Sequence, residues 1–212
     1  MIIAKIDYIN LLPFYVFLKR YLRSSSSKKA LEYHKGVPSS INKAFEKGRI
    51  EAAMISSIVS RGKMCSDLGI IANKKVMSVI LCPGEEKEDS ESNTSNVLAK
   101  ILGLKGEVLI GDKALAYKKK DCIDLATKWY EKYGLPFVFA RFCYKKKVKD
   151  YEKLSKTFLT SHVKIPHYLL KRYAKRSSLS PKEIKAYLKL ICYKIGPKEK
   201  RALKKFFKLA KI

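Results

Sequence analysis

The sequence predicts an α/β fold with mostly parallel strands. Apolar, β-rich runs alternate with amphipathic helical patterns up to residue 143, an order typical of a sheet covered by helices. The clearest case is residues 129–140, where an amphipathic helix meets a Gly-Leu-Pro turn at Gly134 and then an uncharged strand. A chain re-enters a buried sheet in this way, which fits two lobes joined by strands. Beyond residue 143 only helical patterns fit, so a helical C-terminal tail is expected.

The first 64 residues are expected to hold three strands and three helices. The strands are predicted over residues 2–7, 31–34 and 52–55, with a short serine loop over 24–27. The helices are predicted over residues 12–22, 38–47 and 58–64. Pro13 suits the first turn of a helix, where a missing N–H costs nothing. Ser39 or Ser40 can cap the second helix, and Gly48 can end it.

The remaining elements follow the same reading. Strands are predicted over residues 68–72, 76–82, 108–110 and 137–143, and a loop over the acidic stretch 84–95. Helices are predicted over 97–102, with Thr94 and Ser95 in the first turn, and over 123–132. In the tail, Ser180-Pro-Lys-Glu183 is a capping box, and Gly196-Pro197 ends one helix and begins the last.

The charge is strongly positive and unevenly distributed. The net charge is +27, and residues 141–212 carry 23 Lys and Arg against 4 Asp and Glu. Such an excess attracts nucleic acid, acidic membrane surfaces or anionic small molecules. The alternative is a solvated, lysine-rich helical surface, which the interleaving of Lys with apolar residues favours. A composition of 47% hydrophobic and 31% charged residues is globular rather than disordered.

Cysteine and histidine offer little chemistry in this pattern. The five cysteines are scattered with no C-x-x-C pair, so we expect free thiols in a reducing cytosol. The three histidines, His34, His162 and His167, lie in different predicted elements and are expected at the surface or in packing. The apolar segment 8–18 is too short to span a bilayer and lacks a signal-peptide cleavage site, which predicts a cytoplasmic protein.

Small polar residues stand where predicted strands end and helices begin. The sequence lacks G-x-G-x-x-G, Walker, G-x-S-x-G and H-E-x-x-H motifs. The polar residues are Asn10, Ser56, Ser57, Ser78, Asn93, Thr94, Ser95 and Asp112. Ligands of open α/β sheets bind beyond the carboxyl ends of strands, and a helix N-terminus suits a carboxylate. Taken singly, each could be an ordinary turn or capping residue; together they predict a site for a small anion.

Seven ordered motifs between residues 5 and 140 resemble those of the menaquinone-biosynthesis chorismate dehydratases of the futalosine pathway. Residues 5–13 are similar to the family's opening I-x-Y-L-N-x-x-P, and residues 36–39 to its G-V-P-S helix entry. The other five motifs are Glu51–Ile58, Ser78–Leu81, Thr94–Ser95, Ile110–Leu115 and Gly134–Ala140.

The resemblance implies a two-lobed type II periplasmic-binding-protein-like fold with the ligand in the cleft. Residues 1–80 and 141–212 would form one lobe and residues 81–140 the other. Ser78–Cys82 and Phe137–Cys143 would be the crossing strands. The implied reaction is loss of water from chorismate to give 3-[(1-carboxyvinyl)oxy]benzoate. No metal or organic cofactor is implied.

The resemblance also assigns roles to the polar residues. Asn10 and Ser78 would be catalytic, Asn10 near the departing hydroxyl and Ser78 on the hinge strand. Substrate binding would fall to Ser56, Ser57, Asn93, Thr94, Ser95 and Asp112. Ser56, Thr94 and Ser95 would bind carboxylates, and Asp112 would organise the site from behind.

The chain departs from the family pattern at two places. The acidic stretch 85–91 replaces the usual first strand of the second lobe, and Met77 stands where a basic residue is common. Met77 is otherwise expected to be buried.

The alternatives are a non-catalytic small-anion-binding protein of the same fold, a later enzyme of the pathway, and a nucleic-acid-binding protein. The dehydratase interpretation predicts chorismate as the partner, no binding of nucleic acid or membranes, and a possible homodimer.

Overall fold

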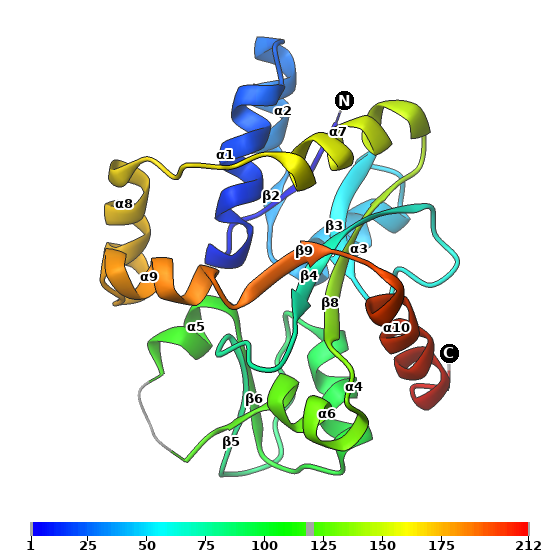
Figure 1. The fold of residues 1–212 in the computed structure, drawn as a ribbon, viewed down its shortest axis with the longest axis vertical. Helices are drawn as coiled ribbons and strands as arrows, with labels where there is room; N and C mark the ends of the chain where they lie inside the picture. Colours follow the sequence, from blue (N-terminus) through cyan, green and yellow to red (C-terminus); the bar gives the residue numbers. More distant parts are fainter. Residues whose placement is uncertain (1, 118–120, 212) are drawn as a thin grey trace.

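The computed structural model describes residues 2–117 and 121–211, shown in Figure 1. The N-terminal part runs through β1 (Lys5–Ile6), the 3₁₀ turn η1 (Ile9–Leu11) and α1 (Leu12–Tyr21). It continues through α2 (Ser25–Tyr33), β2 (Lys35–Gly36), α3 (Pro38–Glu46) and β3 (Ala52–Ser56). The helices predicted over residues 12–22 and 38–47 are confirmed as α1 and α3. They could be predicted because their apolar spacing and N-terminal prolines are local signals.

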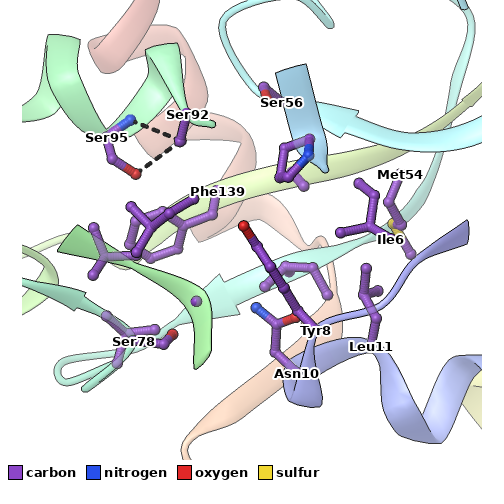
Figure 2. Close-up of a pocket in the computed structure, with 17 residues that line it drawn as sticks. Ile6, Tyr8, Asn10, Leu11, Met54, Ser56, Ser78, Ser92, Ser95 and Phe139 are labelled. Carbon is purple, nitrogen blue, oxygen red and sulfur yellow. Dashed lines mark hydrogen bonds between the residues drawn. The ribbon is translucent and has the colours of Figure 1, made fainter. Parts of the chain in front are cut away.

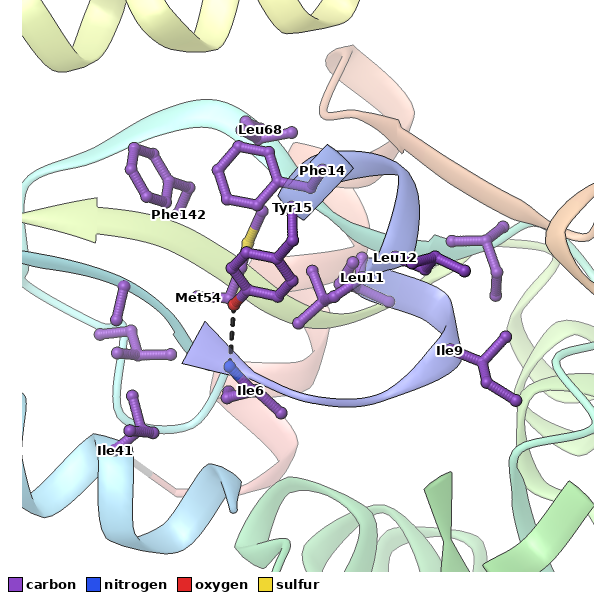
Figure 3. Packing of buried hydrophobic residues seen from close by; sticks show 14 of the residues in the cluster. Ile6, Ile9, Leu11, Leu12, Phe14, Tyr15, Ile41, Met54, Leu68 and Phe142 are labelled. Carbon is purple, nitrogen blue, oxygen red and sulfur yellow. Dashed lines mark hydrogen bonds between the residues drawn. The ribbon is translucent and has the colours of Figure 1, made fainter. Parts of the chain in front are cut away.

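The larger sheet has the order β3-β8-β4-β9 and is antiparallel throughout. Its other strands are β4 (Cys65–Ala72), β8 (Phe137–Tyr144) and β9 (Ile191–Lys194). Phe14 and Tyr15 of α1 cover it on one side, beside Met54 and Phe142 (Figure 3). The Tyr15 hydroxyl accepts a hydrogen bond from the Ile6 N–H at 2.9 Å and so ties β1 to α1.

The smaller sheet has the order β6-β5-β7, also antiparallel. It consists of β5 (Val79–Cys82), β6 (Glu107–Ile110) and β7 (Ile123–Asp124). Its helices are α4 (Asn93–Leu102), α5 (Gly111–Ala116) and α6 (Leu125–Tyr133), which lie in the lower half of Figure 1. The division into lobes at residues 80 and 141 stays a prediction.

The predicted re-entry after α6 is confirmed. Gly134 ends α6 with a positive φ of 64°, and β8 begins at Phe137. The Trp129 indole N–H donates to the Pro136 carbonyl at 3.2 Å, which holds the turn against the helix. The chain thus leaves the larger sheet after β4 and returns to it through β8.

The C-terminal segment consists of α7 (Val148–Thr160), α8 (His167–Ser177), α9 (Pro181–Leu188), β9 and α10 (Pro197–Leu209). The capping box at Ser180 and the helix start at Pro197 are confirmed. The expectation of helices alone is wrong, because β9 pairs with β4 at the sheet edge. The four residues of β9 are too few to show a strand period against the helices around them.

Other sequence-based expectations also fail. The α/β class is confirmed, but the strand pairs are antiparallel within both larger sheets, and β1 with β2 is the parallel strand pair among the described residues. The loop predicted over 24–27 and the strand predicted over 31–34 are wrong, because residues 25–33 form helix α2. The Ser24 hydroxyl caps this helix by accepting from the Ser27 N–H at 3.3 Å. Residues 58–64 form turns instead of a helix.

The expectation of five free thiols is wrong for four of them. Disulfides join Cys65 to Cys143 and Cys82 to Cys122, and Cys192 is free. The β4–β8 register places Cys65 directly opposite Cys143. Pairs separated by 78 and 40 residues leave no spacing signal in the sequence.

Candidate functional site

A cavity with an empty volume of about 560 Å³, its mouth included, lies between the two sheets (Figure 2). Its apolar walls include Met54, Ile70, Val79 and Phe139. Six polar side chains line it: Tyr8, Asn10, Ser56, Ser78, Ser92 and Ser95. Among the described lining residues none is Lys, Arg, His, Asp or Glu. The site is therefore a neutral set of hydroxyls and one amide in an apolar wall.

Four of the eight predicted site residues line this cavity, namely Asn10, Ser56, Ser78 and Ser95. The other four do not. The Ser57 hydroxyl donates to the Val138 carbonyl at 2.6 Å, and Thr94 Oγ1 accepts from the Ile58 N–H at 3.2 Å. Asn93 is exposed at the start of α4. Ser57 and Thr94 therefore hold the main chain around the cavity, and Asn93 lies outside it.

Asn10 lies in η1, which turns the chain from β1 into α1. Its main-chain carbonyl accepts from the Tyr193 hydroxyl at 2.7 Å. Its side-chain Oδ1 is buried and has no hydrogen-bond partner among the residues that the structure describes. Because buried polar atoms are normally paired, this oxygen is an acceptor available to a ligand.

Ser78 precedes β5 rather than lying inside it, which corrects the prediction. Its main-chain carbonyl accepts from the Gly111 N–H at 2.8 Å. Its hydroxyl oxygen accepts from the Tyr187 hydroxyl at 2.8 Å. Ser78 is 2% exposed, so both its main chain and its side chain are held in a buried position.

Ser56 ends β3 and is held in a similar way. The Asn42 amide donates to Ser56 Oγ at 2.8 Å, and Asn42 Oδ1 accepts from the Ser56 N–H at 3.1 Å. A serine oxygen that accepts from a buried donor keeps its own hydrogen for another partner. Ser56 and Ser78 are therefore both arranged as donors toward the cavity.

The N-terminus of α4 contributes two serines. Ser92 caps the helix by accepting from the Ser95 N–H at 3.3 Å, and the two hydroxyl oxygens lie 2.9 Å apart (Figure 2). The positive end of the helix dipole adds to these donors. Sequence reasoning missed Ser92, although a serine three residues before Ser95 is a capping signal.

Tyr8 was also missed as a site residue. It extends into the middle of the cavity in Figure 2 and donates to a Glu91 carboxylate oxygen. Burial and the Glu91 carboxylate raise the pKa of Tyr8 well above its usual value, so it stays protonated. Its place in the quoted I-x-Y-L-N pattern was the available signal.

Gly111 makes room for Tyr8. A Cβ at this position would lie 2.8 Å from the Tyr8 ring, and the residue has a positive φ of 62°. Only glycine meets both conditions without strain. The close approach brings α5 against η1, the turn that carries Asn10.

Asp112 lies behind the cavity wall. Its Oδ1 accepts from the Ile9 N–H at 3.2 Å, and its Oδ2 lies 2.5 Å from the Arg176 guanidinium. Burial raises the pKa of Asp112 against the opposing effects of Ile9 and Arg176. The carboxylate thus anchors the turn that presents Asn10, although it does not itself line the cavity.

Met77 is not buried as expected but 43% exposed, with a φ of 61°. The main-chain N–H groups of Val76 and Met77 donate to Asp124 Oδ2 at 3.0 and 2.6 Å. These bonds fix the unusual backbone before Ser78.

Within the described residues, no three potential metal-binding side chains gather, and no helix is long and apolar enough to cross a membrane.

Comparison with known proteins gives a consistent result. A family model described as menaquinone biosynthesis matches residues 1–107 and 103–211. A chorismate dehydratase from Campylobacter jejuni is 49% identical over 218 residues, covering 100% of this chain and 98% of the relative.

Comparison with solved structures includes two matches at low sequence identity. An X-ray structure of a protein from Archaeoglobus fulgidus has a TM-score of 0.68 at 13% identity, covering 99% of this chain and 96% of that one. A Candida albicans protein described as having the generic periplasmic binding protein fold has a TM-score of 0.43 at 10% identity, covering 96% and 89%.

Proposed function

Because this chain belongs to the menaquinone-biosynthesis family, we propose that it is a lyase that removes water from chorismate. The product is 3-[(1-carboxyvinyl)oxy]benzoate. One structural observation carries the proposal: a single neutral cavity contains Asn10, Ser78 and the serine-capped start of α4. This combination suits a small dicarboxylate that carries a hydroxyl group.

The chemistry of the elimination suits a neutral site. The C–H bond of the ring carbon that bears the ether oxygen breaks, its electron pair forms the last ring double bond, and the hydroxyl on the neighbouring ring carbon leaves; proton and hydroxyl together make water. The proton lost is γ to the ring carboxylate through a double bond, so conjugation assists its removal, and aromatisation drives the step. The site must orient the substrate more than supply a strong base. The reaction is redox-neutral and calls for no electron carrier.

Asn10 serves the departing hydroxyl in this proposal. Its unpartnered Oδ1 accepts the hydrogen of the ring hydroxyl and so orients the C–O bond that breaks. The Tyr193 contact and the Asp112 anchor keep η1 in place, so the amide is preorganised. Preorganisation means that little reorientation is needed during the reaction.

The two carboxylates are bound by dipoles and hydroxyls. Ser92 and Ser95 lie at the positive end of α4 and suit one carboxylate. Ser56 directs a donor hydroxyl toward the cavity from β3 and suits the other carboxylate. Since the described lining holds no cation, these donors carry the recognition of charge.

The test is to incubate the purified protein with chorismate and follow ultraviolet absorbance, which changes on aromatisation. Mass spectrometry should then find a product lighter by one water, also when a chelator is present. Recovery of unchanged chorismate from the wild-type protein would contradict the proposal and favour a non-catalytic anion-binding protein. The cytoplasmic location, the homodimer and the lack of nucleic-acid binding stay predictions.

A further inference from the structure

Two tyrosines of the C-terminal segment reach the candidate site. Tyr187 of α9 donates to Ser78 Oγ at 2.8 Å, and Tyr193 of β9 donates to the Asn10 main-chain carbonyl at 2.7 Å. Neither tyrosine is among the eight site residues predicted from the sequence. Of the two, Tyr187 alone contacts a side-chain group that lines the cavity.

We infer that Tyr187 is a positioning residue that sets the Ser78 hydroxyl as a hydrogen-bond donor to the substrate. The inference rests on the proposed function, since it names the substrate of that site as the group that receives the hydrogen. It adds a role for α9, a helix that contributes no residue to the cavity lining.

The direction of the Tyr187 bond decides the orientation of Ser78. Tyr187 is 3% exposed, and burial raises the pKa of its hydroxyl against the opposing contacts of Ser78 and Asn10. The hydroxyl therefore stays protonated and donates its only hydrogen to Ser78. A serine hydroxyl has one hydrogen and two lone pairs, so the occupied lone pair leaves the hydrogen of Ser78 to another acceptor.

The surroundings of Ser78 leave the cavity as the place for that acceptor. Its main chain is held by Gly111, and its side chain is 2% exposed and lines the cavity. Ser56 repeats the arrangement on the other sheet, with Asn42 in the place of Tyr187. Two serines, each fixed by a buried donor, thus direct their hydrogens into one small space.

The decisive experiment is a double-mutant cycle on chorismate turnover. Tyr187→Phe removes one hydroxyl and keeps the ring. It should lower kcat roughly tenfold, the size expected for one oriented hydrogen bond, while KM and the dissociation constant of the added benzoate product change less than about twofold. In the Ser78→Ala background the same change should have a much smaller effect, because Ser78 is the stronger of the two contacts of the Tyr187 hydroxyl, ahead of Asn10.

Tyr151→Phe is the matched control, since it also removes the hydroxyl of a buried tyrosine. The Tyr151 hydroxyl donates to a Glu51 carboxylate oxygen at 3.0 Å, and neither residue lines the cavity. It should match Tyr187→Phe in melting temperature and retain wild-type kcat. A 3-fluorotyrosine at position 187 keeps the donor and should restore turnover, which also decides the matter if Tyr187→Phe fails to fold.

Three results would overturn the inference: unchanged kcat in Tyr187→Phe, an equal loss in the Ser78→Ala background, or no rescue by fluorotyrosine. Wild-type turnover separates this failure from that of the proposed function. A wild-type protein that leaves chorismate intact overturns both, whereas an active wild type with an unaffected Tyr187→Phe overturns only the role of Tyr187.

Discussion

The cavity and the charged cluster beside it treat polar groups in opposite ways. We define the Asp7 cluster as Lys5, Asp7, Lys35, Tyr173, Arg176 and Asp112. In this cluster Asp7 contacts Lys35 at 2.7 Å, Arg176 at 2.8 Å and the Tyr173 hydroxyl, and Arg176 also binds Asp112. In the cavity the groups are neutral, and Asn10 Oδ1 has no partner within the described chain.

The difference separates groups that hold the fold from groups that await a ligand. Each charged side chain of the Asp7 cluster contacts one of opposite charge, so few of its groups are available to bind a substrate. The cavity keeps an acceptor and several hydroxyl hydrogens unused. The two regions meet at Asp112, which links Arg176 to the Ile9 N–H beside Asn10. The Asp7 cluster, whose polar groups are paired, thus supports the cavity, where Asn10 Oδ1 is unpaired among the described residues.

The largest effect is expected from Asn10→Ala, which removes the unpartnered acceptor. Turnover should fall by about a hundredfold or more, the scale of losing one group of a preorganised site. The melting temperature should stay close to that of wild type, because the lost oxygen makes no internal hydrogen bond. The control is Asn73→Ala, an exposed asparagine outside the cavity. Full activity in Asn10→Ala would remove the basis of the comparison.

A smaller effect is expected at the helix caps. Ser92→Ala and Ser24→Ala each remove an N-cap and should each cost about 1 kcal/mol of stability. Only Ser92→Ala should also raise KM, by roughly fivefold, because Ser92 lines the cavity and Ser24 does not. Steady-state kinetics with thermal unfolding of both variants checks this. Equal KM values would show that α4 does not bind a substrate carboxylate.

The Asp7 cluster should affect stability rather than turnover. Burial raises the pKa of Asp7, but Lys35, Tyr173, Lys5 and Arg176 outweigh it, so the pKa is lowered overall. A lowered pKa stabilises the fold above the unfolded value of about 4, and this stability is lost as the pH falls below it. Urea midpoints should therefore drop more between pH 5 and 3 in wild type than in Asp7→Asn. Parallel pH curves would contradict the assignment.

The smallest effect is expected from Glu91→Gln. The amide keeps an acceptor for the Tyr8 hydroxyl but removes a negative charge beside a cavity proposed to bind two carboxylates. KM should fall about twofold at low salt and the gain should vanish at high salt, since Lys113 at 2.9 Å already offsets much of the charge. Glu88→Gln, which removes an exposed carboxylate paired with Lys100, should leave KM unchanged.

Local signals were enough for much of the fold. The helix with Pro13, the capping box at Ser180 and the Gly134 turn were predicted because each is decided within a few residues. Helix α2 was missed because four consecutive serines are typical of a loop, although Ser24 caps a helix there. The antiparallel pairing was missed because alternating elements do not reveal that the chain leaves one sheet and returns to it.

The candidate site divides in the same manner. Asn10, Ser56, Ser78 and Ser95 were predicted because they stand in recognisable motifs, and they line the cavity. Tyr187 was missed because its partner lies 109 residues away in the sequence. No pattern in a single chain distinguishes a tyrosine that packs from one that orients a distant hydroxyl.

The hydrogen bonds of Tyr187 and Tyr193 also bear on the order of folding. They join residues 109 and 183 positions apart, and contacts of such separation require the closure of long loops. Helices such as α1 and α10 can form early, whereas the site is complete only when β9 has joined the edge of the sheet. On dilution from denaturant, the recovery of turnover should therefore lag behind the recovery of helical circular dichroism.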